Sequence, residues 1–189
     1  MKNTKVRLIS ESAILLALAI VLSFIKIWNM PMGGSVTLLS MLPILLIAIK
    51  NGTAWGVGTA FLFSMFQLVQ AVVEGNVFPY CKTIEIVTLC IVFDYIVPFT
   101  ALGLCALGKK HFGNIGIYVG IFAVCIIRFL CHFYTGVVIW GQWATGTSKS
   151  LYSLLYNGQY MLPELTLTLV AAIVLLNAKA MRKMLNLTK

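Results

Sequence analysis

Three charged side chains lie well inside hydrophobic segments of this sequence: Asp94, Arg128 and Glu164. A charge at such a depth in a membrane costs on the order of 2.5 to 3.5 kcal/mol on insertion scales, so the carboxylate of Asp94 needs a partner. One interpretation is an internal ion pair with Arg128, with Glu164 as a further member. The other is an external ligand with a cationic or hydrogen-bond-donating group. The sequence leaves open whether Arg128 pairs with Asp94, with Glu164 or with neither.

An aromatic face accompanies these charges. His132, Gly136 and Trp140 follow one another at four-residue spacing, so they share one face of a helix, with Arg128 one turn below. Rings on this face together with one buried carboxylate suit a planar cation, because cation–π attraction reaches about 2 kcal/mol when desolvated. Each ring taken alone has a simpler explanation, since Trp and Tyr form belts at membrane interfaces.

The sequence carries no motif for catalysis or metal binding. Its five cysteines, at positions 81, 90, 105, 125 and 131, form no CxxC pair and no metal-like cluster with the two histidines. HExxH, GxSxG, Walker A and Rossmann fingerprints are absent. Asp94 and His132 are the right types for an acid/base pair of an intramembrane hydrolase, but no motif supplies a nucleophile. We therefore expect neither an enzyme nor a metal site.

Composition determines the class of protein that must position these residues. Of 189 residues, 60% are hydrophobic and 10% are charged, and the mean hydropathy is +0.97. Soluble proteins carry roughly 25% charged residues, and a membrane-spanning helix needs about 20 mostly apolar residues. The sequence predicts an all-α integral membrane protein, with residues 1–189 forming a single membrane domain and no room for an ATPase module. Six transmembrane helices are expected, at about 8–27, 36–49, 53–73, 84–107, 115–139 and 156–178.

Several of these segments have features of their own. Segment 36–49 has about 14 residues and is short for a full crossing. Gly52, Gly56 and Ala60 repeat every four residues, which lets a neighbouring backbone approach closely. Pro98 is expected to kink the fourth segment. A signal peptide is the competing interpretation of the first segment, but its Ala-Leu-Ala sequence at 17–19 lies inside the apolar run.

The basic residues indicate an orientation. The net charge is +9. An even number of crossings places both termini on one side, and that side holds ten basic residues against three on the other, so both termini are expected to be cytoplasmic. Nucleic acid is not needed to explain the charge. The ten are Lys2, Lys5, Arg7, Lys50, Lys109, Lys110, Lys179, Arg182, Lys183 and Lys189; the three are Lys26, Lys82 and Lys149.

Four segments carry a resemblance to a known family. They are the GGSVT turn at 33–37, the Asp94-Tyr95 pair, HFYTGVVIWGQ at 132–142 and YSLLYNG at 152–158. Together with six short spans, they resemble the thiamine-specific substrate-binding (S) components of energy-coupling factor (ECF) vitamin transporters. The resemblance covers essentially the whole chain, and its specific part is HF-x-x-G-x-x-x-W followed by YSL-x-x-NG.

The resemblance implies a function and partners. Such a protein captures thiamine with high affinity at the outer face of the bacterial plasma membrane. It works with a separate transmembrane coupling subunit and two ATPases, so the chain itself has no cofactor and ATP is used only by its partners. The lipid bilayer is its other partner. Two alternatives remain: an S component for another vitamin, such as riboflavin or biotin, and a self-sufficient small transporter or channel.

The resemblance also implies site residues. The acidic residue and the Tyr that bind the aminopyrimidine fall on Asp94 and Tyr95. A His, a Gly and a Trp that lie against the ligand match His132, Gly136 and Trp140, and the Tyr and Asn before the last span match Tyr152 and Asn157.

Two further features follow from the same resemblance. A Trp that some members place in the first outer loop has no counterpart here: the aligned position is Gly34, and Trp28 or Met32 could substitute for it. Ala13 and Ala17 match the Ala-x-x-x-Ala pattern of the first helix, which contacts the coupling subunit in the family. Small residues four apart allow close helix contact, although alanine is common in any membrane helix.

Overall fold

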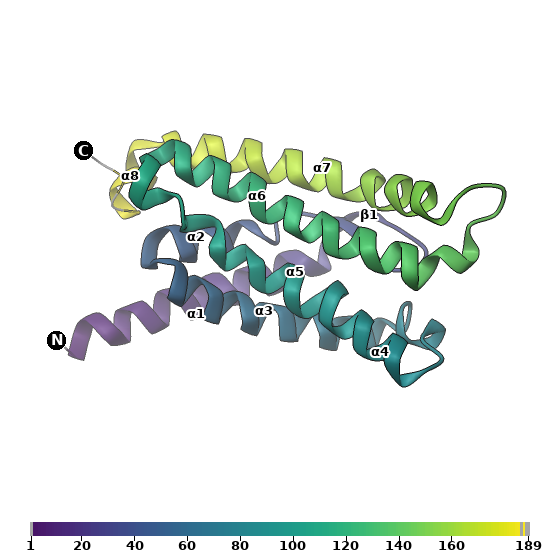
Figure 1. Ribbon diagram of the computed structural model, residues 1–189. Helices are drawn as coiled ribbons and strands as arrows, with labels where there is room; N and C mark the ends of the chain where they lie inside the picture. Colours follow the sequence, from purple (N-terminus) through teal and green to yellow (C-terminus); the bar gives the residue numbers. More distant parts are fainter. Residues whose placement is uncertain (1, 186, 188–189) are drawn as a thin grey trace.

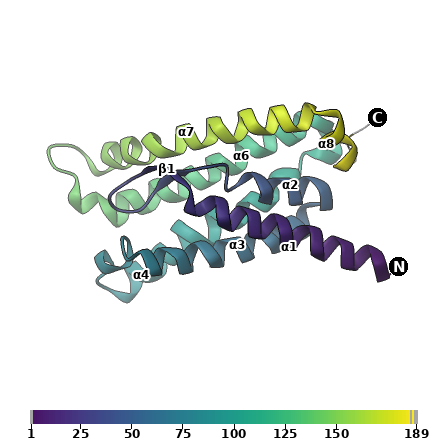
Figure 2. The same ribbon diagram turned by 180° about the vertical axis from the view of Figure 1, so that it is seen from behind.

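The computed structural model describes residues 2–185 and 187. Its helices run roughly along one axis, and both ends of the described chain lie at the same end of the bundle (Figures 1 and 2). We call this the terminal end and the opposite one the cavity end. Within the described residues, five segments are long and apolar enough to cross a membrane. They are α1 (Lys2–Phe24, apolar from Lys5), α3 (Thr53–Glu74), the continuous segment Ile84–Ala106, α6 (Lys109–Val138) and α7 (Lys149–Asn177).

The second crossing differs from the sequence prediction. In place of a helix at 36–49, a hairpin of β1 (Lys26–Asn29) and β2 (Ser35–Thr37) leads into α2 (Leu42–Asn51). Ten helical residues span about 15 Å, half of a bilayer core, so six full-length helices are not confirmed. Every residue from position 42 to position 49 is buried. This segment is apolar because other helices surround it, and hydropathy does not distinguish protein surroundings from lipid.

Close backbone contacts hold α2 in the middle of the bundle. A Cβ on Gly56 of α3 would overlap Ala48 of α2 and lie 2.9 Å from the carbonyl oxygen of Gly103. Ala60, one turn further along α3, is fully buried. Of the small-residue repeat predicted from the sequence, Gly56 thus lies where α3 packs against two neighbours, and a larger side chain there would separate them. Gly52 precedes α3, and a Cβ there would meet no atom within 4 Å.

The fourth span changes its helical form around the charged residue that it carries. It begins as α4 (Ile84–Cys90), becomes π-helical over η2 (Ile91–Ile96), and ends as α5 (Val97–Thr100) and the 3-10 segment η3 (Ala101–Ala106). Pro98 has no N–H and its ring would crowd the carbonyl of Asp94 four residues earlier, which accounts for the widened turn. Such π turns are frequent at functional sites, and this one contains Asp94.

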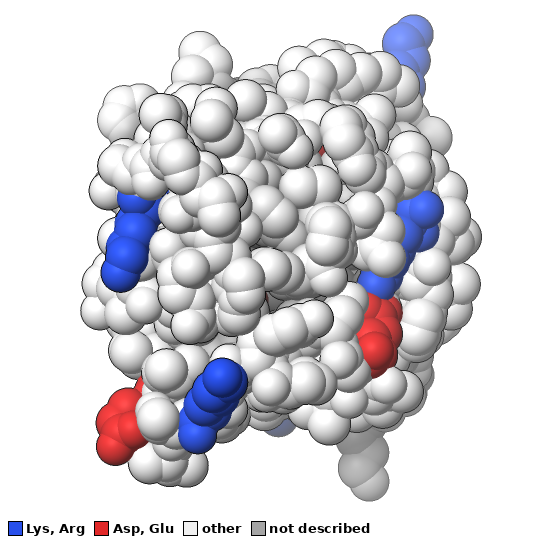
Figure 3. Space-filling model, turned by 90° about the vertical axis from the view of Figure 1, so that its right-hand side faces the viewer, with Lys and Arg blue, Asp and Glu red and all other residues white. Residues whose placement is uncertain are grey.

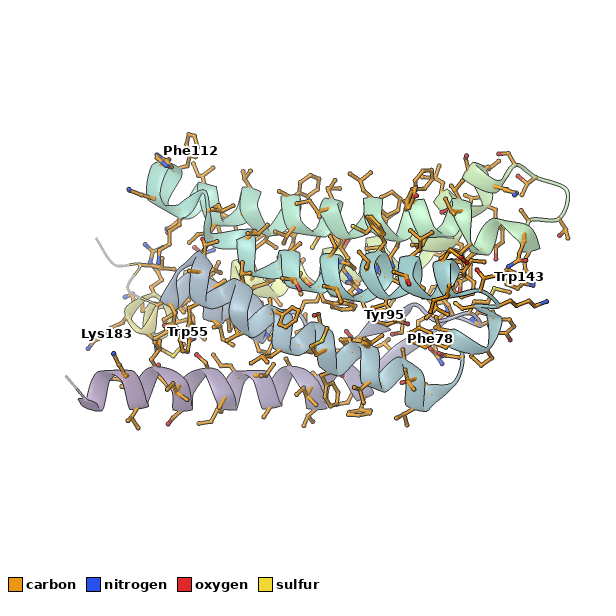
Figure 4. All side chains as sticks on the ribbon, turned by 60° about the horizontal axis from the view of Figure 1, so that its bottom comes forward. Trp55, Phe78, Tyr95, Phe112, Trp143 and Lys183 are labelled. Carbon is orange, nitrogen blue, oxygen red and sulfur yellow. The ribbon has the colours of Figure 1, made fainter. Side chains whose placement is uncertain are left out.

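The remaining elements close the two ends of the bundle. α6 begins at Lys109, and its helical backbone geometry is interrupted at Gly113, where φ is 56°. The elements η1 (Phe78–Tyr80) and η4 (Trp140–Trp143) belong to loops, and α8 (Lys179–Met184) follows α7. Figure 4 shows Phe78, Tyr95 and Trp143 toward the cavity end and Lys183 at the terminal end.

Candidate functional site

A cavity of about 110 Å³ lies between α3, η2, α6, α7 and the hairpin. Figure 3 views the cavity end of the molecule, where charged side chains are few and lie toward the rim. All seven ligand-site residues expected from the sequence line this one cavity. They are Asp94, Tyr95, His132, Gly136, Trp140, Tyr152 and Asn157.

Asp94 is buried, with 7% of its surface exposed, and hydrogen bonds reach its carboxylate from α4, α6 and η4. Its Oδ1 lies 3.1 Å from His132 Nδ1, and Trp140 Nε1 donates to its Oδ2 at 3.4 Å. Thr135 Oγ1 also donates to Oδ1, and the Cys90 thiol donates to Oδ2 at 3.5 Å. The carboxylate is therefore held in place by hydrogen bonds, and no lysine or arginine of the described residues pairs with it.

Arg128 pairs with Glu164, which answers the question that the sequence left open. The guanidinium Nη1 donates to Glu164 Oε2 at 2.8 Å, and both side chains are buried. The other carboxylate oxygen accepts from Thr37 Oγ1 at 2.9 Å, so the pair joins the hairpin to α6 and α7. The guanidinium also lies over the ring of Phe99, 4.7 Å from its centroid. Arg128 is therefore not the partner of Asp94.

Replacing Arg128 with leucine should destabilise the fold strongly. It leaves the Glu164 carboxylate buried and uncompensated, and breaking such a pair on one side costs about 3–5 kcal/mol. The measurement is thermal unfolding of the purified protein in detergent. The double variant R128L/E164L removes both charges and should recover at least half of the lost stability. Equal melting temperatures for R128L and the parent would contradict this role of the pair.

With His132 counted as neutral, the lining of the cavity carries a formal charge of −1. Its lining contains two basic side chains, Lys26 and Arg128, and three acidic ones, Glu74, Asp94 and Glu164. Lys26 Nζ binds both oxygens of Glu74, at 2.5 and 2.6 Å, and Arg128 neutralises Glu164. One negative charge, that of Asp94, remains in a site of low dielectric constant. Such a site favours a ligand with one positive charge.

Aromatic rings surround this charge. Trp140 stacks on Trp143 with centroids 5.7 Å apart, and Tyr152 stacks on Tyr156 at 5.9 Å. The ring of His132 meets Tyr160 edge-on at 6.3 Å. All of these rings except that of Trp143 line the cavity, from α6, η4 and α7. A flat ligand can pack against them, with further attraction if it is cationic.

Gly136 lets α7 approach α6 at the cavity. A Cβ at this position would overlap Ser153 and lie 2.9 Å from Asn157 Nδ2. That amide donates to the His132 carbonyl at 3.1 Å, and Tyr160 donates to Asn157 Oδ1 at 2.8 Å. Gly136 therefore positions Asn157 as well as lining the cavity.

The hairpin contributes Met32 to the cavity, and not Trp28. Met32 is part of the lining, its N–H donates to Tyr156 at 3.1 Å, and its sulfur lies 4.0 Å from the Tyr152 hydroxyl. Trp28 is 51% exposed and lies outside the lining. Gly34 has φ +77°, and a Cβ there would come within 2.7 Å of the Tyr160 ring. A Trp side chain does not fit at position 34 with this arrangement of Tyr160.

Three buried polar atoms without a partner belong to residues that line the same cavity. Among the described residues, four buried side-chain nitrogen or oxygen atoms have no hydrogen-bond partner, and three of them belong to Gln67, Arg128 and His132, which line the cavity. They are Gln67 Oε1, Arg128 Nε and His132 Nε2. An unsatisfied buried polar group costs about 1–3 kcal/mol. A ligand with several hydrogen-bonding groups would remove this cost.

Sequence reasoning missed the wall that α3 contributes. Gln67, Gln70 and Glu74 all line the cavity. Their spacing of three and four places them on one face of α3, and polar side chains in a membrane helix face its protein interior or a water-filled cavity. This spacing of polar residues in an otherwise apolar span was a signal in the sequence that α3 lines a cavity or a protein interior.

Ala13 and Ala17, the expected docking residues, lie elsewhere. Both are exposed on α1, and neither lines the cavity. In the described part of the chain, no three His, Cys, Asp or Glu side chains are grouped as a metal site would require, and all five cysteines are free. Burial raises the pKa of the Cys81 thiol, which favours its protonated form.

Comparisons with known proteins agree on one family. The sequence model of the family described as "Thiamine transporter protein (Thia_YuaJ)" matches residues 9–184 of this chain. The thiamine transporter ThiT of Bacillus subtilis (strain 168) is 33% identical, with 90% of this chain and 88% of that protein covered. ThiT of Lacticaseibacillus paracasei is 29% identical, with 89% and 86% covered. A solved structure of ThiT from Listeria monocytogenes shares the fold, with a TM-score of 0.72 and 21% identity over 97% of this chain and 99% of that one.

Proposed function

The chain belongs to the thiamine transporter protein family, which is a family of membrane transporters and not of enzymes, and we propose that it binds thiamine in the cavity described above. The observation that carries this proposal is the combination of one uncompensated carboxylate, Asp94, with stacked aromatic rings. Thiamine joins a thiazolium cation to a flat aminopyrimidine and matches both features. A monocation also cancels the net charge of the cavity.

We infer a division of labour among the lining residues. The rings of Trp140 and His132 pack against the aromatic ligand, while Asp94 and Asn157 bind the polar edge of the aminopyrimidine. His132 Nε2 is unpartnered and available to the ligand because Nδ1 is directed at Asp94. Tyr95, Tyr152 and Gly136 complete the walls. Stacking and charge supply affinity, and the hydrogen bonds supply specificity.

We propose further that the protein is the S component of an ECF transporter in the cell membrane. In this proposal the energy for uptake comes from a separate coupling subunit and two ATPases. Both ends of the described chain lie at one end of the bundle (Figure 1), and the basic residues of α8 lie there as well. Lys189 lies outside the described residues. The positive-inside rule makes this end cytoplasmic and the cavity end external.

Ala13 and Ala17 provide a test of the coupling step. Replacing both with tryptophan should abolish thiamine uptake by cells that contain the coupling subunits, because the bulky rings would block a close helix contact. Thiamine binding by the purified variant should stay within about twofold of the parent. Ile14 and Leu18 are also exposed and four residues apart, so I14W/L18W is the matched control and should retain uptake. Equal loss in both variants would contradict a specific role of the alanine face.

The identity of the vitamin has a direct test. Protein purified from cells grown with thiamine, riboflavin and biotin should release thiamine on denaturation, as identified by mass spectrometry. Release of riboflavin or biotin would overturn the assignment of the ligand. Vesicles that contain this chain without ATPases should accumulate negligible thiamine; rapid accumulation would favour a self-sufficient transporter instead.

A further inference from the structure

Gln67 has an unmet hydrogen bond at the cavity, although its neighbours on α3 are fully engaged. Gln70 accepts from Ser23 at 3.0 Å and donates to Glu74 at 2.9 Å, and Glu74 binds Lys26 at 2.5 Å. These bonds tie α3 to α1 and to the hairpin. Gln67 Oε1, by contrast, is buried without any partner. It is the acceptor that this wall still offers to a ligand.

A chain of packed rings connects Arg128 to α3, one helical turn from Gln67. The guanidinium of Arg128 lies over Phe99, and Phe99 meets Phe63 edge-on with centroids 5.8 Å apart. Gln67 lies one helical turn beyond Phe63 toward the cavity end. On α6, Arg128 lies one turn below His132, away from the cavity end. We call Gln67 and Arg128 the cavity floor.

The two side chains of the floor offer complementary groups. Arg128 Nε–H can only donate a hydrogen bond, and Gln67 Oε1 can only accept one. Both atoms are unpartnered, and they come from opposite walls, α6 and α3. A hydroxyl group satisfies both at once because it accepts and donates. The ion pair with Glu164 neutralises Arg128, so the floor does not repel a cationic ligand.

We propose that the cavity floor binds the hydroxyl group of the hydroxyethyl arm of thiamine, with Arg128 Nε donating to it and Gln67 Oε1 accepting from it. This inference rests on the proposed function and adds α3 to the ligand site. Asp94, His132 and Asn157 lie above the floor and are engaged by the aminopyrimidine. With the aminopyrimidine bound there, the hydroxyl is the group of thiamine that is left to donate one hydrogen bond and accept another.

The experiment combines one substitution with one change in the ligand. Gln67→Leu removes the acceptor at similar size, and the probe is a thiamine analogue with ethyl in place of hydroxyethyl. Calorimetry should show thiamine binding weakened about tenfold in Q67L, the value of one lost hydrogen bond. The parent should bind the analogue about tenfold or more weakly than thiamine. The Kd of the analogue should differ by less than about twofold between parent and Q67L.

The controls separate the possible failures. Gln142 is exposed outside the cavity, with its amide bonded to the Ile139 carbonyl, so Q142L should leave both affinities unchanged. If Q67L weakens thiamine and the analogue equally, Gln67 has only a structural role and the proposal is overturned. It is also overturned if Q67L weakens neither. Failure of the parent to bind thiamine at all would instead refute the proposed function.

Discussion

Replacing Asp94 with asparagine should weaken thiamine binding by about 100-fold or more. The substitution keeps the size of the side chain and one acceptor for Thr135, but it removes the single uncompensated negative charge of the cavity. A hydrogen bond to a charged group contributes about 1.5–3 kcal/mol, and about 2.7 kcal/mol corresponds to a factor of 100. The loss of charge balance with the thiazolium adds to this. Titration of the protein with thiamine, followed by tryptophan fluorescence, gives the Kd.

A matched control is available on the same span. Glu85 is an exposed carboxylate at the start of α4, outside the cavity, so Glu85→Gln makes the same chemical change without touching the site. Its thiamine affinity should equal that of the parent. A D94N variant that binds within twofold of the parent would remove Asp94 from the ligand site.

Replacing Gly136 with valine should abolish measurable thiamine binding. Even a Cβ at this position overlaps Ser153 and crowds the Asn157 amide, and valine adds two methyl groups to that contact. The helices α6 and α7 must then separate where they carry His132 and Asn157. Overpacking of this kind costs about 1–3 kcal/mol in stability, and a displacement of about 1 Å at a site can cost 100-fold in function. Equilibrium dialysis with labelled thiamine and a thermal melt measure the two effects.

Gly158 gives the comparison for this variant. It lies next to Asn157 on α7, and a Cβ added there would meet no atom within 4 Å. Gly158→Ala should preserve binding and raise stability by about 0.5–1 kcal/mol, because glycine is unfavourable inside a helix. Unchanged binding in G136V would show that the approach of α7 to α6 at this point is not needed for the site.

Much of the site followed from the sequence because membrane helices constrain it. Charged residues are rare in such segments, so Asp94, Arg128 and Glu164 were conspicuous. Helical spacing predicted one face for His132 and Trp140, but α6 ends at Val138, and Trp140 reaches the same cavity from η4. The pairing of Arg128 was not predictable. It depends on which faces of α6 and α7 meet, and their packing places the Glu164 carboxylate, and not that of Asp94, within 2.8 Å of the guanidinium.

Other features depend on the three-dimensional fold in ways that hydropathy cannot show. α2 has the composition of a membrane span, yet it has only ten residues, which lie within the bundle and follow a β-hairpin. The hairpin brings Met32 and Thr37 to the cavity from a segment with few sequence signals. The spacing of Gln67 marks a polar face of α3, but only the structure shows that its side-chain carbonyl oxygen is buried without a hydrogen-bond partner.

The central claim is that this one cavity binds thiamine through Asp94 and the rings around it. The most direct measurement is calorimetric titration of the purified parent with thiamine, riboflavin and biotin, repeated for D94N. We expect saturable one-to-one binding of thiamine alone to the parent, and its loss in D94N. Absence of a thiamine signal in the parent, or equal binding by parent and D94N, would contradict it.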